Sequence, residues 1–212
     1  MVVAADVGGP EVDNDKARDV LAAARELFGQ VGYAKAGVRE IARRANVAVG
    51  TVYAHFPSGK VDVLEAVMSD RMRSLVAHVL GSPLEDPVER FLDATRRLNS
   101  ELVRDPLLRK LRSEQGRIPE PRLRERGRQI EDRFHAIAVD RLREMDAAGL
   151  IHCPDPEAVA TLLRVTTRGW LQARDDGRDL VEHDRMLEML LDGVRALINS
   201  GGRAAAPADR GR

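Results

Sequence analysis

Apolar residues recur along most of the chain at the three- and four-residue spacing of an amphipathic helix. Over residues 14–32 one helix face carries Ala17, Val20, Leu21, Ala24, Leu27, Phe28 and Val31. A second, short apolar face follows at residues 38–45. A third short helix is predicted over residues 48–55, with Val52 and Phe56 turned inward.

The breaks between these helices contain residues suited to turns. Gly32 is expected to end the first helix. Gly37 can cap the second helix, less well than Ser or Thr would. Asn46 can take the left-handed conformation that a tight turn requires. The sequence therefore predicts three short, closely connected helices.

Longer amphipathic helices are predicted after a Pro-Ser-Gly break at residues 57–59. The first begins near Lys60 and ends near Gly81. Others are expected at residues 86–103, 106–115, 121–148, 156–173 and 183–199, with Pro, Gly or Asp at the breaks. No alternating run of β-branched residues is present, so the predicted fold is all α.

The same pattern divides the chain into four parts. Residues 1–13 are small and acidic and are expected to be a disordered lead-in. Residues 14–60 form the three-helix module, and residues 61–200 a larger helical domain. The tail, residues 201–212, is of low complexity and is expected to be disordered.

Charge is balanced over the whole chain but not over the module. The 212 residues include 34 Lys and Arg and 34 Asp and Glu. Residues 35–60 carry five cations, Lys35, Arg39, Arg43, Arg44 and Lys60, against the single anion Glu40, a net charge of +4. Bulk attraction to nucleic acid is therefore excluded, whereas a local basic surface is predicted.

Two short helices joined by a tight turn, with small residues at the start of the second, are typical of a helix-turn-helix. Small side chains at residues 48–51 would let that helix approach base edges in a DNA major groove, where Val49 could touch a thymine methyl. Arg39, in the first turn of the leading helix, could reach a guanine edge. Tyr53, His55 and Lys60 would contact the DNA backbone.

These residues together resemble the DNA-binding module of the TetR family of transcriptional regulators. The resemblance rests on Phe28 through Gly32-Tyr33, Val38-Arg39-Glu40-Ile41-Ala42, Ala45, Val47, Gly50-Thr51-Val52-Tyr53, His55-Phe56, Lys60 and Leu64. It implies an all-α homodimer, usually a repressor, with an N-terminal three-helix helix-turn-helix DNA-binding domain and a C-terminal helical ligand-binding and dimerisation domain. By position it implies that Arg39, Val49 and Gly50 face bases and that Thr51, Tyr53, His55 and Lys60 mostly hold phosphates.

The sequence departs from the family at the interface itself. Ala36 and Gly37 stand where the family often has Thr or Ser, and Ala48 where it favours Ser. Val49 replaces a basic or polar residue. The operator sequence therefore cannot be taken from relatives. A dimeric adaptor with weakened DNA specificity remains an alternative, and a helical enzyme is disfavoured because no nucleophile, metal or phosphate-cradling constellation is recognisable.

The larger domain carries two further hypotheses. The last two helices are predicted to form a four-helix homodimer interface with a second copy, through Ala158, Val165, Gly169, Leu187, Leu190, Leu191, Val194 and Leu197, while Val159, Leu162, Leu163, Thr166 and Trp170 would pack inward. Three aromatic residues outside the module, Phe91, Phe134 and Trp170, could line a pocket for a small hydrophobic ligand, although ordinary core packing is at least as good a reading of each.

Other features indicate a cytoplasmic protein. Cys153 is the single cysteine and cannot form an internal disulfide. No stretch approaches the roughly 20 apolar residues of a membrane span, so no membrane partner is expected. No cofactor and no metal site are predicted, because the spacing of His152, Cys153 and Asp155 fits no usual ligand set.

Overall fold

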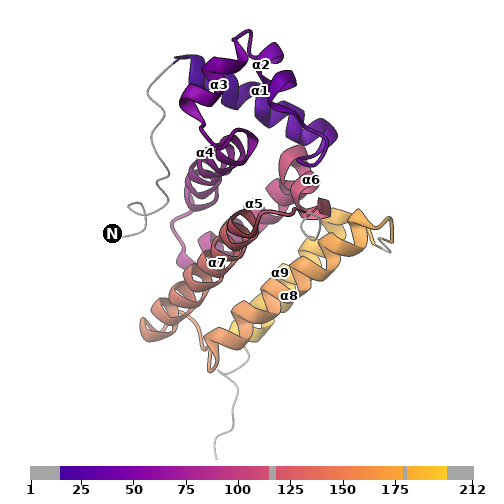
Figure 1. Cartoon of the computed structure of the whole chain (residues 1–212). Helices are drawn as coiled ribbons and strands as arrows, with labels where there is room; N and C mark the ends of the chain where they lie inside the picture. Colours follow the sequence, from indigo (N-terminus) through magenta and orange to yellow (C-terminus); the bar gives the residue numbers. More distant parts are fainter. Residues whose placement is uncertain (1–14, 115–117, 179–180, 200–212) are drawn as a thin grey trace, which may run out of the picture. The chain divides into compact units, whose positions relative to one another are not determined.

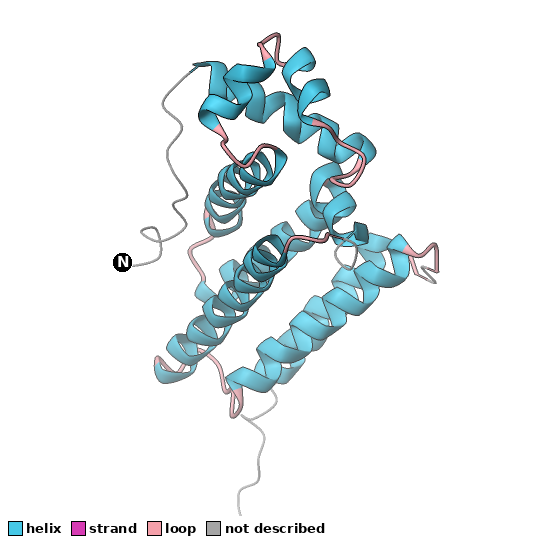
Figure 2. Ribbon diagram, in the orientation of Figure 1, coloured by secondary structure: helices cyan, strands magenta, loops and turns pink. Residues whose placement is uncertain are grey.

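The structure is a computed structural model that describes residues 15–114, 118–178 and 181–199. These residues form nine helices and contain no strand (Figures 1 and 2), which confirms the all-α prediction. The lead-in and the tail predicted to be disordered lie outside the described residues. None of the described helices is long and apolar enough to cross a membrane.

The helix boundaries follow the predicted ones closely. The helices are α1 (Asp15–Val31), α2 (Val38–Arg44), α3 (Val49–His55), α4 (Lys60–Leu80), α5 (Pro87–Arg104), α6 (Pro106–Glu114), α7 (Pro121–Ala147), α8 (Pro156–Asp175) and α9 (His183–Asn199). Prolines at the first turns of α5, α6, α7 and α8 set the starts of those helices, because proline lacks the N–H that a first-turn position does not need.

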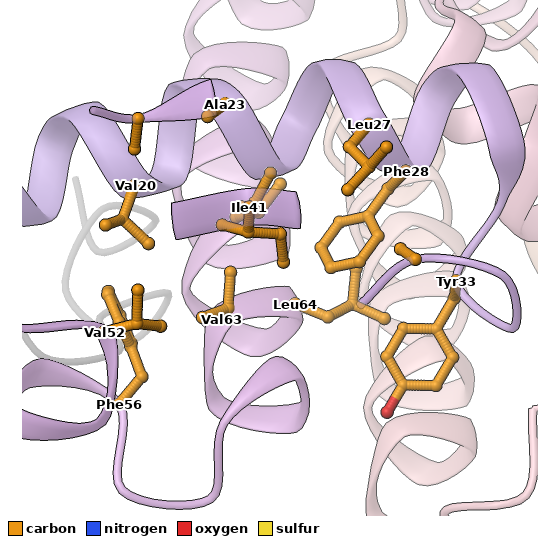
Figure 3. Close-up of a cluster of buried hydrophobic side chains, with 14 of the residues drawn as sticks. Val20, Ala23, Leu27, Phe28, Tyr33, Ile41, Val52, Phe56, Val63 and Leu64 are labelled. Atoms are coloured by element: carbon orange, nitrogen blue, oxygen red, sulfur yellow. The ribbon is translucent and has the colours of Figure 1, made fainter. Parts of the chain in front are cut away.

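The chain forms two compact units, and α5 and α7 each contribute to both. Of the described residues, unit 1 comprises those up to Gly81 and those within 97–129, and unit 2 comprises those within 82–96 and from residue 130 onward. In unit 1, α1 packs against α2, α3, α4 and α6. Figure 3 shows its hydrophobic core, in which Phe28 and Val20 of α1 lie near Ile41 of α2, Val52 of α3 and Leu64 of α4.

This core continues past the end of the predicted three-helix module at Lys60. It includes Val63, Leu64 and Val67 of α4, Leu107 of α6 and Leu123 of α7. Three short helices have too little apolar surface to close a core alone, and the following helices complete it. The helix-turn-helix is thus packed directly on segments that come much later in the sequence.

A buried ion-pair network lies beside the core of unit 1. Arg71 of α4 is paired with Glu101 of α5 and with Asp105, and the side chains of Arg71 and Asp105 are 8% and 4% exposed. Asp105 Oδ1 also accepts hydrogen bonds from the first N–H groups of α6, at 2.8 Å from Leu107 N and 3.3 Å from Leu108 N. One carboxylate therefore caps α6 and anchors α4.

Unit 2 has its own core, built from α7, α8, α9 and the first part of α5. It contains Phe91, Leu92, Val139, Leu142, Met145, Ile151, Cys153, Val159, Ala160, Leu163, Leu187, Leu191, Val194 and Ile198. Cys153 is buried, and this burial raises the pKa of its thiol. The side chain therefore packs as part of the apolar core of unit 2.

The structure corrects part of the predicted dimer interface. Leu187, Leu191 and Val194 are only 3%, 3% and 2% exposed, because α9 turns these side chains into the core of unit 2. They have little surface to offer a second subunit. Conversely, Leu162 was expected to pack inward but is 48% exposed and lies close to Val165 on α8.

Candidate nucleic-acid interface

The turn between α2 and α3 is as tight as the sequence predicts. Asn46 has a φ of 54°, in the left-handed region that Asn tolerates better than most residues. The N–H of Val47 donates to the carbonyl of Ala42 at 3.0 Å, which closes the end of α2. The N-cap positions Gly37 and Ala48 have no side-chain cap, so both short helices depend on packing against α1 and against each other.

Helix α3 has one buried and one exposed side. Val52 and the following Phe56 are 0% and 4% exposed, which confirms that they pack inward. On the other side, Val49 and Tyr53 are 38% and 49% exposed. Gly50 and His55 are also exposed, and Thr51 is partly buried. Five of the seven predicted contact residues therefore share one short helix, most of them accessible to a partner.

Tyr53 is held by the backbone that precedes α4. Gly59 has a φ of 62°, and a Cβ at this position would lie 3.1 Å from Tyr53 Cε1 and 3.3 Å from a methyl group of Val38. Only glycine adopts this conformation and leaves room for the aromatic ring. Gly59 thus lets Tyr53 rest against the start of α4 while half of the tyrosine stays exposed.

Helix α2 presents three arginines with different surroundings. Arg39 is exposed and makes no hydrogen bond or ion pair with the described residues. Arg43 and Arg44 both pair with Glu40, and Arg44 also donates to Gln30 Oε1 of α1 at 2.8 Å. Of these three side chains, Arg39 is the one whose charge is available to an incoming anion.

Lys60 faces the interior of the module. Its ammonium donates to the carbonyl oxygens of Tyr33 at 3.1 Å and Ala36 at 3.4 Å, and lies 4.4 Å from the centre of the Tyr33 ring. Two of its three donors are thus used inside the module, which leaves one for the phosphate contact expected of Lys60. In the structure Lys60 connects the turn after α1 to the start of α4.

Tyr33 is the second feature of this junction that the sequence did not predict. Its N–H donates to Glu114 Oε2 and its hydroxyl to Glu120 Oε1, both at 2.8 Å. Burial, followed by the hydrogen bond to Glu120, raises the pKa of Tyr33 above its ordinary value. More than 80 residues separate these partners along the chain, and no local sequence pattern predicts such a pairing.

The predicted ligand-binding and interface residues lie in unit 2 and differ in how far their side chains are exposed. Phe91 is 9% exposed and belongs to the core, while Phe134 is partly buried. Trp170 is also partly buried and stacks on His183 with ring centres 4.8 Å apart. The remaining interface candidates are accessible: Ala158, Val165, Gly169 and Leu197 are exposed and Leu190 is partly buried.

Comparison with known proteins identifies the module. Residues 20–67 match the family model described as bacterial regulatory proteins, tetR family. The HTH-type transcriptional repressor KstR of Rhodococcus jostii (strain RHA1) is 31% identical over 111 residues, which are 50% of this chain and 52% of the repressor. The chain thus spans about half the length of the curated relatives it matches.

Solved structures extend the likeness to the whole fold. The transcriptional regulator FadR from Bacillus subtilis, in complex with stearoyl-CoA, superposes with a TM-score of 0.70 at 20% identity, covering 86% of this chain and 99% of FadR. The fatty acid degradation regulator FadR from Bacillus halodurans gives a TM-score of 0.67 at 22% identity, covering 87% and 99%. At these identities the likeness concerns the fold alone.

The tight turn at Asn46, the two-sided α3 and the exposed Arg39 define a helix-turn-helix protein with an appended helical domain. Residues 20–67 carry the sequence of one family in this class. That family is the tetR family of bacterial regulatory proteins, to which this module is similar in sequence.

Proposed function

We propose that this protein is a ligand-responsive transcriptional regulator, a repressor released from a pseudo-palindromic DNA operator by a small hydrophobic ligand. The observation that carries this proposal is the exposed side of α3, where Val49, Gly50 and Tyr53 remain accessible while Val52 and Phe56 fill the core. A helix with this distribution can enter a major groove without disturbing the fold.

Individual residues would contribute to DNA binding in different ways. Arg39 would read a guanine edge, and Val49 and Gly50 would lie against bases. Thr51, Tyr53 and His55 would contact the DNA backbone and fix the register of the helix. Lys60, whose ammonium is bonded to two carbonyl oxygens, would act mainly by positioning the start of α4.

Dimerisation would use the exposed side of α8 and α9. Leu162 and Val165 of α8 are 48% and 61% exposed, and Met189 and Leu197 of α9 are 64% and 40% exposed. Several large apolar side chains exposed on two helices are typical of an interface. A two-fold dimer would present two copies of α3 to the two half-sites of an operator.

The ligand would bind in unit 2, near the aromatic residues Phe91, Phe134 and Trp170. The indole Nε1 of Trp170 is buried and has no hydrogen-bond partner among the described residues, so a ligand acceptor could satisfy it. The stearoyl-CoA complex of the Bacillus subtilis FadR supports a long-chain acyl compound as the first class to test. Trp170 is the single tryptophan of the chain, so its fluorescence would report binding directly.

Selection of duplexes from a random DNA library would test the DNA-binding half of this proposal. Purified protein should enrich an inverted repeat, and titration of that duplex should show affinity that falls with salt. Release of the duplex by an acyl compound, together with a change in Trp170 fluorescence, would support the ligand half. Failure to enrich any sequence would favour the dimeric adaptor instead.

A further inference from the structure

The carboxylate of Glu40 accepts hydrogen bonds from two arginines of the helix-turn-helix, Arg43 and Arg44. Its Oε2 accepts from Arg43 Nε at 2.8 Å, and its Oε1 accepts from Arg43 Nη2 at 2.7 Å and from Arg44 Nε at 2.9 Å. The Arg43 contact is bidentate, the geometry in which a guanidinium also grips a phosphate. Glu40 therefore occupies one edge of Arg43 and the Nε–H of Arg44, donors that could otherwise bind a phosphate.

These internal contacts leave the net charge of residues 35–60 at +4 but engage three of its five cations within the fold. Arg43 and Arg44 share Glu40 as an ion-pair partner, and the ammonium of Lys60 is directed at the carbonyls of Tyr33 and Ala36. Lys35 and Arg39 are the two cations of this segment that have no partner among the described residues. Arg43 follows Arg39 by four positions, so both lie on one side of α2.

We propose that Glu40 is a specificity-determining residue that withholds Arg43 and Arg44 from the DNA backbone. Phosphate contacts strengthen binding to every duplex alike and carry no sequence information. By satisfying both arginines internally, Glu40 weakens binding to random DNA and leaves recognition to Arg39 and α3. Such opposition to the wrong partner is a common source of specificity. The inference rests on the proposed DNA-binding function.

The pairing persists at every pH at which the protein would work. The hydrogen bonds from Arg43, and then those from Arg44, hold the pKa of Glu40 at about 2. The carboxylate is thus ionised throughout, and the arginines are withheld constantly rather than in response to pH. A phosphate must compete with an anion that is already in place.

A purely structural role for Glu40 makes different predictions. Ion pairs three and four residues apart stabilise a helix, and Arg44 also links α2 to Gln30 of α1. If this were the whole role, loss of the charge would lower the melting temperature without changing how DNA affinity depends on salt. The salt dependence therefore separates the two roles.

The test uses full-length protein, its selected operator duplex and a random-sequence duplex, each titrated over a series of NaCl concentrations. For Glu40→Gln we expect tighter binding to random DNA and a smaller ratio of operator to random affinity. The slope of log affinity against log salt should steepen by about 0.9 for each arginine freed, or about 1.8 per subunit. Glu144→Gln, which frees Arg141 from a similar exposed pair on α7, is the matched control and should leave the slope unchanged.

A second variant keeps the test decisive if Glu40→Gln folds poorly. Replacing both arginines, in Arg43→Gln/Arg44→Gln, should leave the wild-type slope nearly unchanged because these residues are not on phosphates. A slope that falls by about 1.8 per subunit in this double variant would overturn the proposal. So would a folded Glu40→Gln protein with the wild-type slope. A wild-type protein that prefers no duplex would instead overturn the proposed function.

Discussion

Within α3, residues three positions apart serve opposite purposes. Val49 and Val52 have the same side chain, yet Val52 is completely buried and Val49 is 38% exposed. Residues three positions apart lie only about 60° apart around a helix, so the difference comes from the surroundings: Val49 is the first residue of α3, whereas Val52 packs in the core of unit 1 with Phe56. Identity alone does not assign a role to a residue here, whereas identity together with position on the helix does.

Arg39 is the residue on which base reading should depend most. Arg39→Ala is expected to cost about 1–3 kcal/mol per half-site on the selected operator and to relax preference at one base pair. Repeating the selection with the variant measures both effects. Lys35→Ala is the comparison: it should weaken all duplexes alike by removing a cation without a base partner. Equal loss on operator and random DNA for Arg39→Ala would contradict the assignment.

Gly32 is required by the turn that follows α1. Its φ of 86° lies in the left-handed region, and a Cβ there would overlap the carboxylate of Glu114, which accepts the N–H of Tyr33. Gly32→Ala should therefore lower the free energy of unfolding by about 1–2 kcal/mol, measured by urea denaturation. Gly127→Ala, in the interior of α7 where an added Cβ meets nothing within 4 Å, should instead raise it by about 0.5–1 kcal/mol. A neutral Gly32→Ala would contradict this account.

At the scale of elements, the helix-turn-helix is tied to helices that follow it by more than 40 residues. Tyr33 bonds to Glu114 at the end of α6 and to Glu120 just before α7. Asp105 joins the start of α6 to α4 through Arg71, and Arg25 of α1 lies 3.4 Å from the same carboxylate. A displacement of α6 would therefore act on α1 and α4 through polar bonds as well as apolar packing.

The buried pair between Asp105 and Arg71 should dominate the stability of this connection. Asp105→Asn keeps the shape of the side chain but leaves a buried guanidinium with only Glu101 as its ionic partner. We expect a loss of about 3 kcal/mol in the free energy of unfolding. Asp70→Asn breaks an exposed pair with Arg73 and should cost less than about 1 kcal/mol. Urea denaturation at neutral pH compares the two, and similar losses would contradict the argument.

What the sequence could predict follows from the range of the interactions involved. Helix positions, the left-handed Asn46 and the inward Phe56 depend on neighbours within a few residues, and all were predicted. The inward turn of Lys60 and the bonds of Tyr33 to Glu114 and Glu120 join residues 27 to 87 positions apart. No periodic pattern encodes such pairs. For the same reason, the apolar face of α9 did not indicate which of its leucines would be buried in the core of unit 2.

At the scale of the whole molecule, the proposed function requires two copies of α3, and hence a dimer. Gly169 of α8 and Gly193 of α9 are exposed within helices, where glycine is unfavourable, and an added Cβ at either meets nothing within 4 Å. The protomer itself gives no packing reason for either glycine. Close approach of a partner helix at these positions would supply one, and the neighbouring Val165 and Leu197 would widen the contact.

Val165→Glu tests this assignment, because it introduces a charge at a residue that is 61% exposed in the protomer. The protomer should fold normally, so its melting temperature in the monomeric state should hardly change, whereas burial of the carboxylate against a second subunit is unfavourable. Sedimentation velocity at micromolar concentration should show a dimer for the wild type and a monomer for the variant. Operator binding should then fall sharply, because one half-site no longer assists the other.

Two control variants show whether loss of the dimer is specific to the proposed interface or follows from changing any apolar residue. Leu150→Glu makes the same change at a residue that is 50% exposed in the segment after α7, and it should leave the dimer intact. Leu191→Ala removes a side chain that is 3% exposed inside unit 2, so it should destabilise the fold by about 2–5 kcal/mol without a specific effect on association. If Val165→Glu remains dimeric, the second subunit does not bind through this side of α8, and the spacing of the two α3 helices must be set by another surface.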